Sequence, residues 1–384
     1  MSSNWLIDTL LHALGIALAF AAAGYACVAL WAVMKGSRKT QRVPLRTGSP
    51  QPASILKPLH GAEPRLYENL RSFCQQAHPE YQLVFGVRDP DDPAIAVVER
   101  LRREFPQRSI ALAVDPRVHG ANFKVSNLMN MLPHVQHDLL VLADADIYVE
   151  PDYLTRVTAP LADPGVGIVT CLYYGIPVRS FWSRLGRLFI DDWFAPSVKL
   201  SHAFGSTRFA FGSTIALRRD ALQAIGGFEA LRDTLADDFW LGELTRRADL
   251  RTVLSDVVVG TDVAESHLKD LWAHELRWLR TIRSIAPAGF AMTFVCFTSP
   301  LLLLGLCLAP GPASVGLAAL GGGARVLLHF LQRRISDRAF AWHEVLLIPL
   351  RDALLLMEWA AALAGWQVRW RGQVLHARGD GSAP

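Results

Sequence analysis

The chain has 384 residues, of which 51% are hydrophobic and 19% charged, and this composition excludes a disordered or fibrous protein. Lysine plus arginine number 39 against 35 acids, an excess too small to indicate nucleic acid as the main partner. The five cysteines have neither C-x-x-C nor zinc-type spacing, which favours a reduced, cytosol-facing protein. Because the apolar residues are unevenly distributed, we expect a membrane protein with one soluble domain.

The first predicted element is a transmembrane helix. Residues 14–34 carry no charge, and about 20 apolar residues suffice to cross a bilayer as a helix. Five basic residues between positions 35 and 46 follow this run instead of leading it, so a cleaved signal peptide is not expected. The positive-inside rule then predicts a membrane helix over 1–34 and a basic cytoplasmic linker over 35–51.

Residues 52–267 have the pattern of a soluble α/β domain, in which short runs rich in Val, Ile and Leu alternate with stretches of helical period. This alternation predicts a Rossmann-like, mostly parallel sheet covered on both faces, with ligands bound beyond the carboxyl ends of its strands. Strands are predicted at 54–57, 81–87, 109–114, 138–144, 165–170 and 252–259, and helices at 64–77, 93–105 and 122–132.

Acidic residues follow two of these strands. Asp144 ends one predicted strand and Asp146 stands two residues later, a pair that can bind a divalent cation which in turn bridges the phosphates of a nucleotide-sugar. The alternative is that these acids only cap the next element. Asp92 stands before Pro93, which is typical of an N-cap followed by the first helical residue, although a cap does not exclude a nucleotide contact.

Two further clusters precede predicted helices. Gly120, Asn122 and Lys124 suit an anionic diphosphate, because free backbone N–H groups and a lysine charge point the same way. The alternative is a glycine turn with Asn122 as the cap. Asp237 and Asp238 open an apolar helix, where one acid is expected to cap and the other can act as general base toward an acceptor hydroxyl.

Residues 268–284 place apolar side chains at helical spacing among basic ones and predict an amphipathic helix at the cytoplasmic surface. Contact with lipid explains its tryptophans and arginines. The alternative has His274, Arg277 and Trp278 facing the diphosphate and the acceptor. A second aromatic-rich stretch, 181–194, could also lie on lipid, but core packing is the favoured interpretation.

Apolar composition returns over 285–370, where we expect transmembrane or re-entrant helices, and the tail 371–384 is expected to fray. The third of the apolar runs contains Arg351, Asp352 and Glu358, which are costly in lipid unless they face protein or water. The three runs are 285–309, 313–331 and 345–366.

Together these motifs resemble the lipid-modifying branch of the family-2-type glycosyltransferases, and specifically family 21, which contains ceramide glucosyltransferases and hopanoid-modifying bacterial enzymes. The resemblance implies a GT-A fold, a UDP-sugar donor, a divalent cation (Mg²⁺ or Mn²⁺) and inversion at the anomeric carbon. The resembling segments are ILKPLHGAEPRLYENL, DPDDPA, GANFKVSNLM, LADADI, GGF, LADDFWLG and HELRWLR, in family order.

The resemblance also implies roles for single residues. Asp238 matches the family's proposed catalytic base, and His274 stands where the (Q/R)-x-x-R-W element usually has glutamine or arginine, which leaves its role open. The expected donor-binding residues are Asp92, Lys124, Asp144, His274, Arg277 and Trp278, and the expected metal ligands are Asp144 and Asp146.

The implied protein is a multi-pass enzyme of the bacterial inner membrane whose catalytic domain faces the cytoplasm and glycosylates a membrane lipid. Within the family the sequence is most similar to the hopanoid-modifying branch, which implies transfer of N-acetylglucosamine from UDP-GlcNAc to bacteriohopanetetrol. Glucosyl transfer to ceramide, a polymerising synthase and a catalytically silent membrane scaffold are the alternatives.

Overall fold

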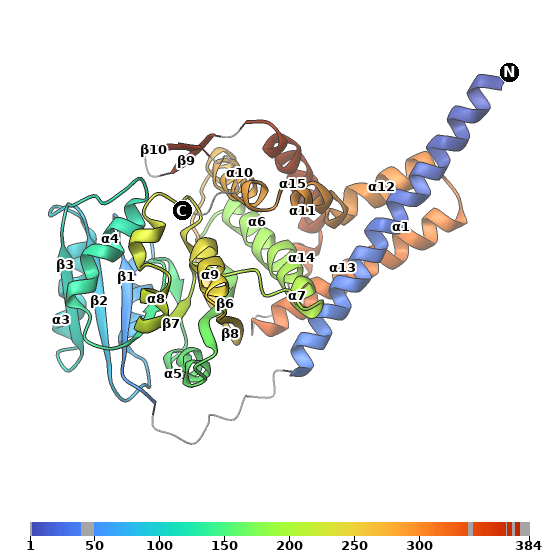
Figure 1. Cartoon of the computed structure of the whole chain (residues 1–384). Helices are drawn as coiled ribbons and strands as arrows, with labels where there is room; N and C mark the ends of the chain where they lie inside the picture. The colour runs from blue at the N-terminus through green and yellow to red at the C-terminus, as the bar shows by residue number, and fades with distance from the viewer. Residues whose placement is uncertain (1, 40–49, 337–340, 366, 371–372, 377–384) are drawn as a thin grey trace. The chain divides into compact units, whose positions relative to one another are not determined.

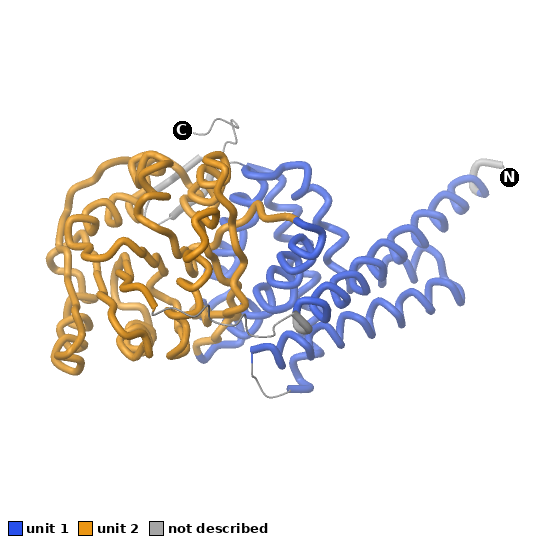
Figure 2. The backbone as a smooth tube through the Cα atoms, turned by 60° about the horizontal axis from the view of Figure 1, so that its bottom comes forward, with its two compact units in different colours: residues 1–41, 179–205, 265–381 blue, residues 42–178, 206–264, 382–384 orange. Residues whose placement is uncertain are grey.

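The computed structural model describes residues 2–39, 50–336, 341–365, 367–370 and 373–376 (Figure 1). Most of the predicted linker over 35–51 and of the predicted tail over 371–384 lies outside the described residues. The chain forms two compact units (Figure 2). Unit 1 comprises residues 1–41, 179–205 and 265–381, and unit 2 comprises 42–178, 206–264 and 382–384.

Unit 2 is built on an eight-stranded sheet with the order β3-β2-β1-β4-β7-β6-β8-β5. Strands β1 to β4 are mutually parallel, whereas β7 runs antiparallel to β4 and β6, and β5 antiparallel to β8. The predicted α/β sheet is therefore confirmed, but it is mixed, because two short strands that the sequence did not reveal pair in the opposite direction. The strands are β1 (Ala53–Pro58), β2 (Tyr81–Val87), β3 (Ser109–Val114), β4 (Leu139–Leu142), β5 (Ile147–Tyr148), β6 (Val166–Pro177), β7 (Ile215–Arg218) and β8 (Arg251–Val263).

Helices cover both faces of this sheet, because successive side chains of a strand point to opposite sides. Ile55 of β1 belongs to the apolar cluster that includes α2 and α3, whereas its neighbour Leu56 belongs to the cluster that includes α4 and α9. Every residue of β1 and β2 is buried, as is typical of central parallel strands. The helices of unit 2 are α2 (Leu66–Cys74), α3 (Ala94–Glu104), α4 (Phe123–Met131), α5 (Tyr153–Thr158), α8 (Arg219–Ala224) and α9 (Asp237–Arg247).

Unit 1 is helical, and its long helix α1 packs along α12 and α13 (Figure 1). Small residues allow this close approach: a Cβ added at Gly305 would lie 2.7 Å from the Cβ of Ala19, and one at Gly321 would lie 3.0 Å from the Cα of Ala23. The helices of unit 1 are α1 (Ser2–Lys39), α6 (Phe181–Phe189), α7 (Ala195–Ala203), α10 (Leu268–Ile285), α11 (Pro287–Met292), α12 (Thr298–Leu308), α13 (Pro312–Ile335), α14 (Trp342–Val345) and α15 (Leu347–Leu363). A π-helix (Ile190–Phe194) joins α6 to α7, and β9 (Gln367–Trp370) pairs with β10 (Gln373–His376).

Two helices among the described residues are long and apolar enough to cross a membrane, Trp5–Gly36 and Pro312–Ile335. The predicted continuous run over 285–309 is instead a broken pair, in which Pro287–Cys296 and Thr298–Leu308 meet at 65°. The third predicted run forms α15, whose 17 residues fall short of such a span. Its three charged side chains are buried and paired inside unit 1, so they face protein, as the cost of charge in lipid requires.

The two aromatic-rich stretches of the sequence both form helices of unit 1. Residues 268–284 fall within α10, which confirms the predicted helix, while its place at the membrane surface stays a prediction. Leu185 and Leu188 of α6 pack against Leu271 of α10 and Leu354 of α15. This confirms that the stretch 181–194 is used for core packing.

Candidate active site

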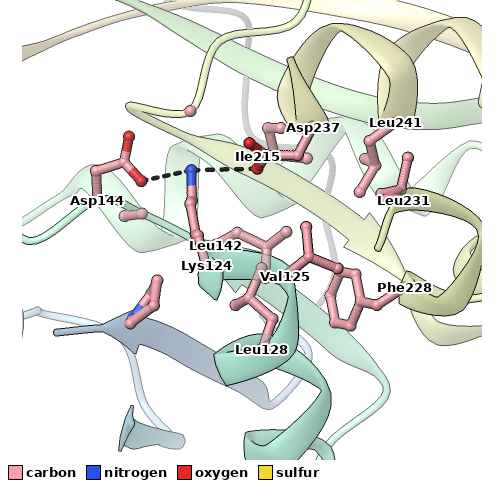
Figure 3. A pocket seen from close by; sticks show the side chains of 13 residues that line it. Lys124, Val125, Leu128, Leu142, Asp144, Ile215, Phe228, Leu231, Asp237 and Leu241 are labelled. Atoms are coloured by element: carbon pink, nitrogen blue, oxygen red, sulfur yellow. Dashed lines mark ion pairs between the residues drawn. The ribbon is translucent and has the colours of Figure 1, made fainter. Parts of the chain in front are cut away.

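Three charged side chains from distant parts of the sequence meet in unit 2 beyond the end of β4 (Figure 3). Lys124, in the first turn of α4, places its Nζ 2.7 Å from Oδ1 of Asp144 and 3.3 Å from Oδ2 of Asp237. Apolar side chains, among them Leu128 and Phe228, line the pocket beneath them. The sequence prediction that Lys124 and Asp144 share a site is consistent with this geometry.

Asp238, the expected catalytic base, is linked to the same cluster through Gly212. The N–H of Gly212 donates to Oδ2 of Asp238 at 3.0 Å, and the carbonyl of Gly212 accepts from the N–H of Asp144 at 3.3 Å. A Cβ at Gly212 would lie 2.7 Å from Oδ2 of Asp144 and 3.2 Å from Nζ of Lys124, so a larger residue here would displace these two side chains. The sequence reasoning missed Gly212, because an ordinary F-G-S-T turn carries no signal of a contact with remote acids.

The charges in this cluster and its burial shift the pKa values of Asp238 and Lys124. Burial raises the pKa of Asp238 to about 6, and the neighbouring charge of Asp237 contributes to the rise. Burial alone would lower the pKa of the Lys124 ammonium. The negative charges of Asp144 and Asp237 outweigh that effect and raise its pKa above the ordinary value for lysine. Lys124 is therefore a permanent cation, whereas Asp238 can exchange a proton near neutral pH.

The second acid of the Asp-x-Asp pair lies beside a different set of groups. Oδ2 of Asp146 accepts from Oγ1 of Thr261 at 2.6 Å, and burial together with the charge of Asp144 raises the pKa of Asp146. Lys57 of β1 donates from Nζ to the backbone carbonyl of Asp144 at 2.5 Å, and burial lowers the pKa of Lys57 to about 7. The sequence analysis did not single out Lys57, which is the one charged residue of β1, a strand whose six residues are all buried.

The residue types at Asp144 and Asp146 fit a hard divalent cation, which prefers carboxylate oxygens. Within the described ranges there is no group of three or more His, Cys, Asp or Glu residues that could hold a metal ion by protein ligands alone. Two carboxylates would suffice where phosphate and water oxygens complete the shell, which is how Mg²⁺ is usually bound. The side chain of Asp144 is 37% exposed and so can reach a ligand.

The predicted cap Asn122 is confirmed, whereas the N-cap position of α3 is occupied by Pro93 and not by Asp92, which lies one residue earlier and still bonds the start of the helix. Asp92 accepts from the N–H of Ala94 at 2.8 Å and, through both oxygens, from the N–H of Gly61 at 3.0 Å. Asn122 accepts through Oδ1 from the N–H groups of Lys124 and Val125 at 2.9 and 3.1 Å. A nucleotide contact of Asp92 stays a prediction.

The expected cap at α9 is wrong. Ala236 occupies the N-cap position, and both Asp237 and Asp238 lie in the first turn of the helix. Carboxylates are favoured there by the helix dipole without acting as caps. Asp237 instead pairs with Lys124, and Asp238 is linked to the same charged cluster through the N–H of Gly212.

His274, Arg277 and Trp278 lie on α10 of unit 1. The His274 ring pairs through Nδ1 with Glu265, and its centroid is 4.6 Å from that of Trp278. Trp278 also packs against Phe189, at 5.4 Å between ring centroids. Their part in donor binding stays a prediction.

The sheet order and the helices on both its faces define a GT-A glycosyltransferase fold. A solved mannosyltransferase from Pyrobaculum calidifontis, in complex with GDP-Man and Mn²⁺, matches 91% of this chain and 98% of its own with a TM-score of 0.56 at 20% identity. At that identity the likeness concerns the fold. The predicted fold class is thus confirmed.

The chain belongs to glycosyl transferase family 21, whose family model matches residues 14–383. Ceramide glucosyltransferase 1 of Caenorhabditis elegans is 23% identical over 253 residues, covering 65% of this chain and 54% of that protein. Beta-monoglucosyldiacylglycerol synthase of Synechocystis sp. is 28% identical over 194 residues, covering 49% of this chain and 38% of that protein. The chain thus spans about half the length, or less, of these relatives, and the resemblance to family 21 is confirmed.

Proposed function

We propose that this protein is an inverting glycosyltransferase that moves a sugar from a UDP-sugar to a hydroxyl group of a membrane lipid. The observation that carries the proposal is the cluster of Lys124, Asp144 and Asp237, with Asp238 joined to it through Gly212, in a GT-A fold. Membership of family 21, relatives named for ceramide and diacylglycerol lipids, and two helices long enough to cross a membrane support a lipid acceptor.

The proposed reaction is a single displacement. The carboxylate of Asp238 takes the proton of the lipid hydroxyl, the oxygen forms a bond to C1 of the sugar, and the bond from C1 to the diphosphate breaks with its electron pair leaving on UDP. Lys124 offsets the charge that grows on the leaving phosphate. Asp144 and Asp146 would hold Mg²⁺ or Mn²⁺, which when bound supplies further neutralisation at the diphosphate. Asp92, His274, Arg277 and Trp278 are the further proposed donor contacts.

We also propose the placement of the chain in the membrane. The N-terminal helix anchors it, the basic segment from Lys35 onward lies in the cytoplasm with the catalytic domain, and 285–370 returns to the bilayer. This is the arrangement of a multi-pass protein of a bacterial inner membrane.

The raised pKa of Asp238 predicts a pH dependence. Asp238 must be ionised to accept a proton, and its pKa is about 6, so kcat/KM is expected to be level above that pH. Below about pH 6 it should fall by about tenfold per pH unit. Initial rates with saturating cation, at pH values where tryptophan fluorescence shows the protein folded, would measure this. A rate that stays constant to about one pH unit below the pKa would contradict the assignment of the base.

For the acceptor, we favour N-acetylglucosamine transfer from UDP-GlcNAc to the hopanoid bacteriohopanetetrol. Transfer of glucose to ceramide is the second candidate, because a ceramide glucosyltransferase is among the relatives. Purified full-length protein should be given each of several UDP-sugars with a mixed membrane extract, and the lipid product identified by mass spectrometry. An N-acetylhexosaminyl hopanoid is the expected product, and a hexosylceramide would favour the second candidate. Transfer from none of the UDP-sugars would favour the scaffold alternative.

A further inference from the structure

A fully buried lysine, Lys57, contacts the turn that carries the proposed metal ligands. Lys57 is fully buried in β1, where the residues of the strand are otherwise mostly apolar. Burying a charged group is unfavourable unless fixed partners compensate for its lost hydration. An apolar side chain at this position would avoid that cost, so the lysine indicates a task beyond filling the core.

The partners of Lys57 fix its ammonium between a helix and the turn after β4. On one side Nζ lies 3.8 Å from the centroid of the Phe73 ring of α2, a cation–π contact. On the other side Nζ donates to the backbone carbonyl of Asp144 at 2.5 Å. The charges of Asp146 and Asp144 also attract the ammonium.

The turn that Lys57 contacts is the segment that carries both proposed metal ligands. The carbonyl of Asp144 also accepts from the N–H of Ile147 at 3.3 Å, and the N–H of Ala143 donates to the carbonyl of Leu56 at 3.2 Å. The segment is therefore held at its start by β1 and near its centre by Lys57.

Lys57 bonds the main chain of Asp144 and not its side chain, so Lys57 occupies neither carboxylate of the turn. Oδ1 of Asp144 pairs with Lys124, and Oδ2 of Asp146 accepts from Thr261. A bound cation in the proposed site would share these oxygens or use the other oxygen of each carboxylate.

We propose that Lys57 is a positioning residue that holds the Asp144–Ala145–Asp146 turn in the shape in which both carboxylates bind one divalent cation. This inference rests on the proposed function, in which those two acids bind the cation. Lys57 acts through the main chain of Asp144 and does not touch the donor. Partners of this kind behind metal ligands typically change metal affinity by about 10- to 100-fold when they are removed.

The test is Mn²⁺ binding to the purified full-length protein in detergent with UDP present, followed by electron paramagnetic resonance of free Mn²⁺. Lys57→Met removes the charge and its N–H donors, and is expected to weaken Mn²⁺ binding by about 10- to 100-fold. Lys57→Arg keeps the charge and the N–H donors on a bulkier side chain, and should bind Mn²⁺ more tightly than Lys57→Met does. The control is Lys199→Met, which removes a half-buried lysine of unit 1 that donates to Gln332 at 2.9 Å, and it should bind as the wild type does.

The outcomes separate this inference from the proposed function. If the wild type binds Mn²⁺ and folded Lys57→Met binds it equally well, the positioning role is overturned while the proposed function stands. If the wild type does not bind Mn²⁺ with UDP, both are overturned. Should Lys57→Met fail to fold, Phe73→Leu decides, because it removes the aromatic contact and keeps the lysine. Weaker Mn²⁺ binding by that variant supports the role, and unchanged binding overturns it.

Discussion

Replacing Asp238 by asparagine is expected to lower sugar transfer by a factor of about 10² to 10⁴, the usual contribution of a general base. The amide has nearly the same shape as the carboxylate, and its oxygen can still accept the N–H of Gly212, which in the native protein lies 3.0 Å from Oδ2. The N–H of Phe239, which donates to Oδ1 at 2.8 Å, loses its acceptor, at a cost of about 1–3 kcal/mol of stability. The variant should still fold, and its donor affinity should be nearly that of the wild type. It cannot take the proton of the acceptor hydroxyl, so the loss should appear in kcat and not in the affinity for the donor.

The measurement is the initial rate of lipid glycosylation, with UDP-sugar affinity determined separately by calorimetry. Asp220→Asn is the matched control, because Asp220 on α8 is 73% exposed and pairs with Arg218 at 3.0 Å, away from the charged cluster. That variant should turn over like the wild type. Substantial turnover by Asp238→Asn would remove Asp238 from the role of base.

The strands and helices that follow local hydrophobic patterns were predictable from the sequence. The runs that became β1 to β4 are short, apolar and separated by helical periods, and each formed within a few residues of its predicted bounds. The rule that ligands lie beyond the ends of parallel strands singled out Asp144, and the position of Lys124 near a helix N-terminus singled out that lysine as a diphosphate contact. In the structure the two side chains form an ion pair at 2.7 Å.

The features that sequence analysis did not predict depend on contacts between residues that are far apart in the chain. Strands β5 and β7 have two and four residues, too short for any periodicity, and they exist because β8, β4 and β6 offer edges to pair with. Gly212 and Lys57 matter through backbone contacts with Asp144, which no local pattern encodes. For the same reason the sequence did not reveal that 179–205 belongs to unit 1, although it stands between two strands of unit 2.

Removal of Arg351, a buried charged residue of unit 1, has the largest expected effect on the stability of the protein. Arg351 of α15 is fully buried and lies between two buried carboxylates, with NH2 2.8 Å from Oε2 of Glu275 and 2.6 Å from Oε2 of Glu358. Arg351→Met would leave both carboxylates buried without this cation. We expect the variant to lose about 3–5 kcal/mol of unfolding free energy, the usual cost of breaking a buried pair by removing one partner.

Unfolding of the full-length protein in detergent, followed by tryptophan fluorescence, would measure this loss. Arg184→Met makes the same substitution at an exposed position of α6 in the same unit, and should change stability by no more than about 0.5 kcal/mol. Combining Arg351→Met with Glu275→Leu and Glu358→Leu should restore most of the stability, because a buried ion cluster replaced as a whole by apolar side chains is often neutral or stabilising. If Arg351→Met alone unfolds like the wild type, then the two carboxyl groups do not stay charged and buried without the arginine, and the expected cost of breaking this buried ion cluster would be wrong.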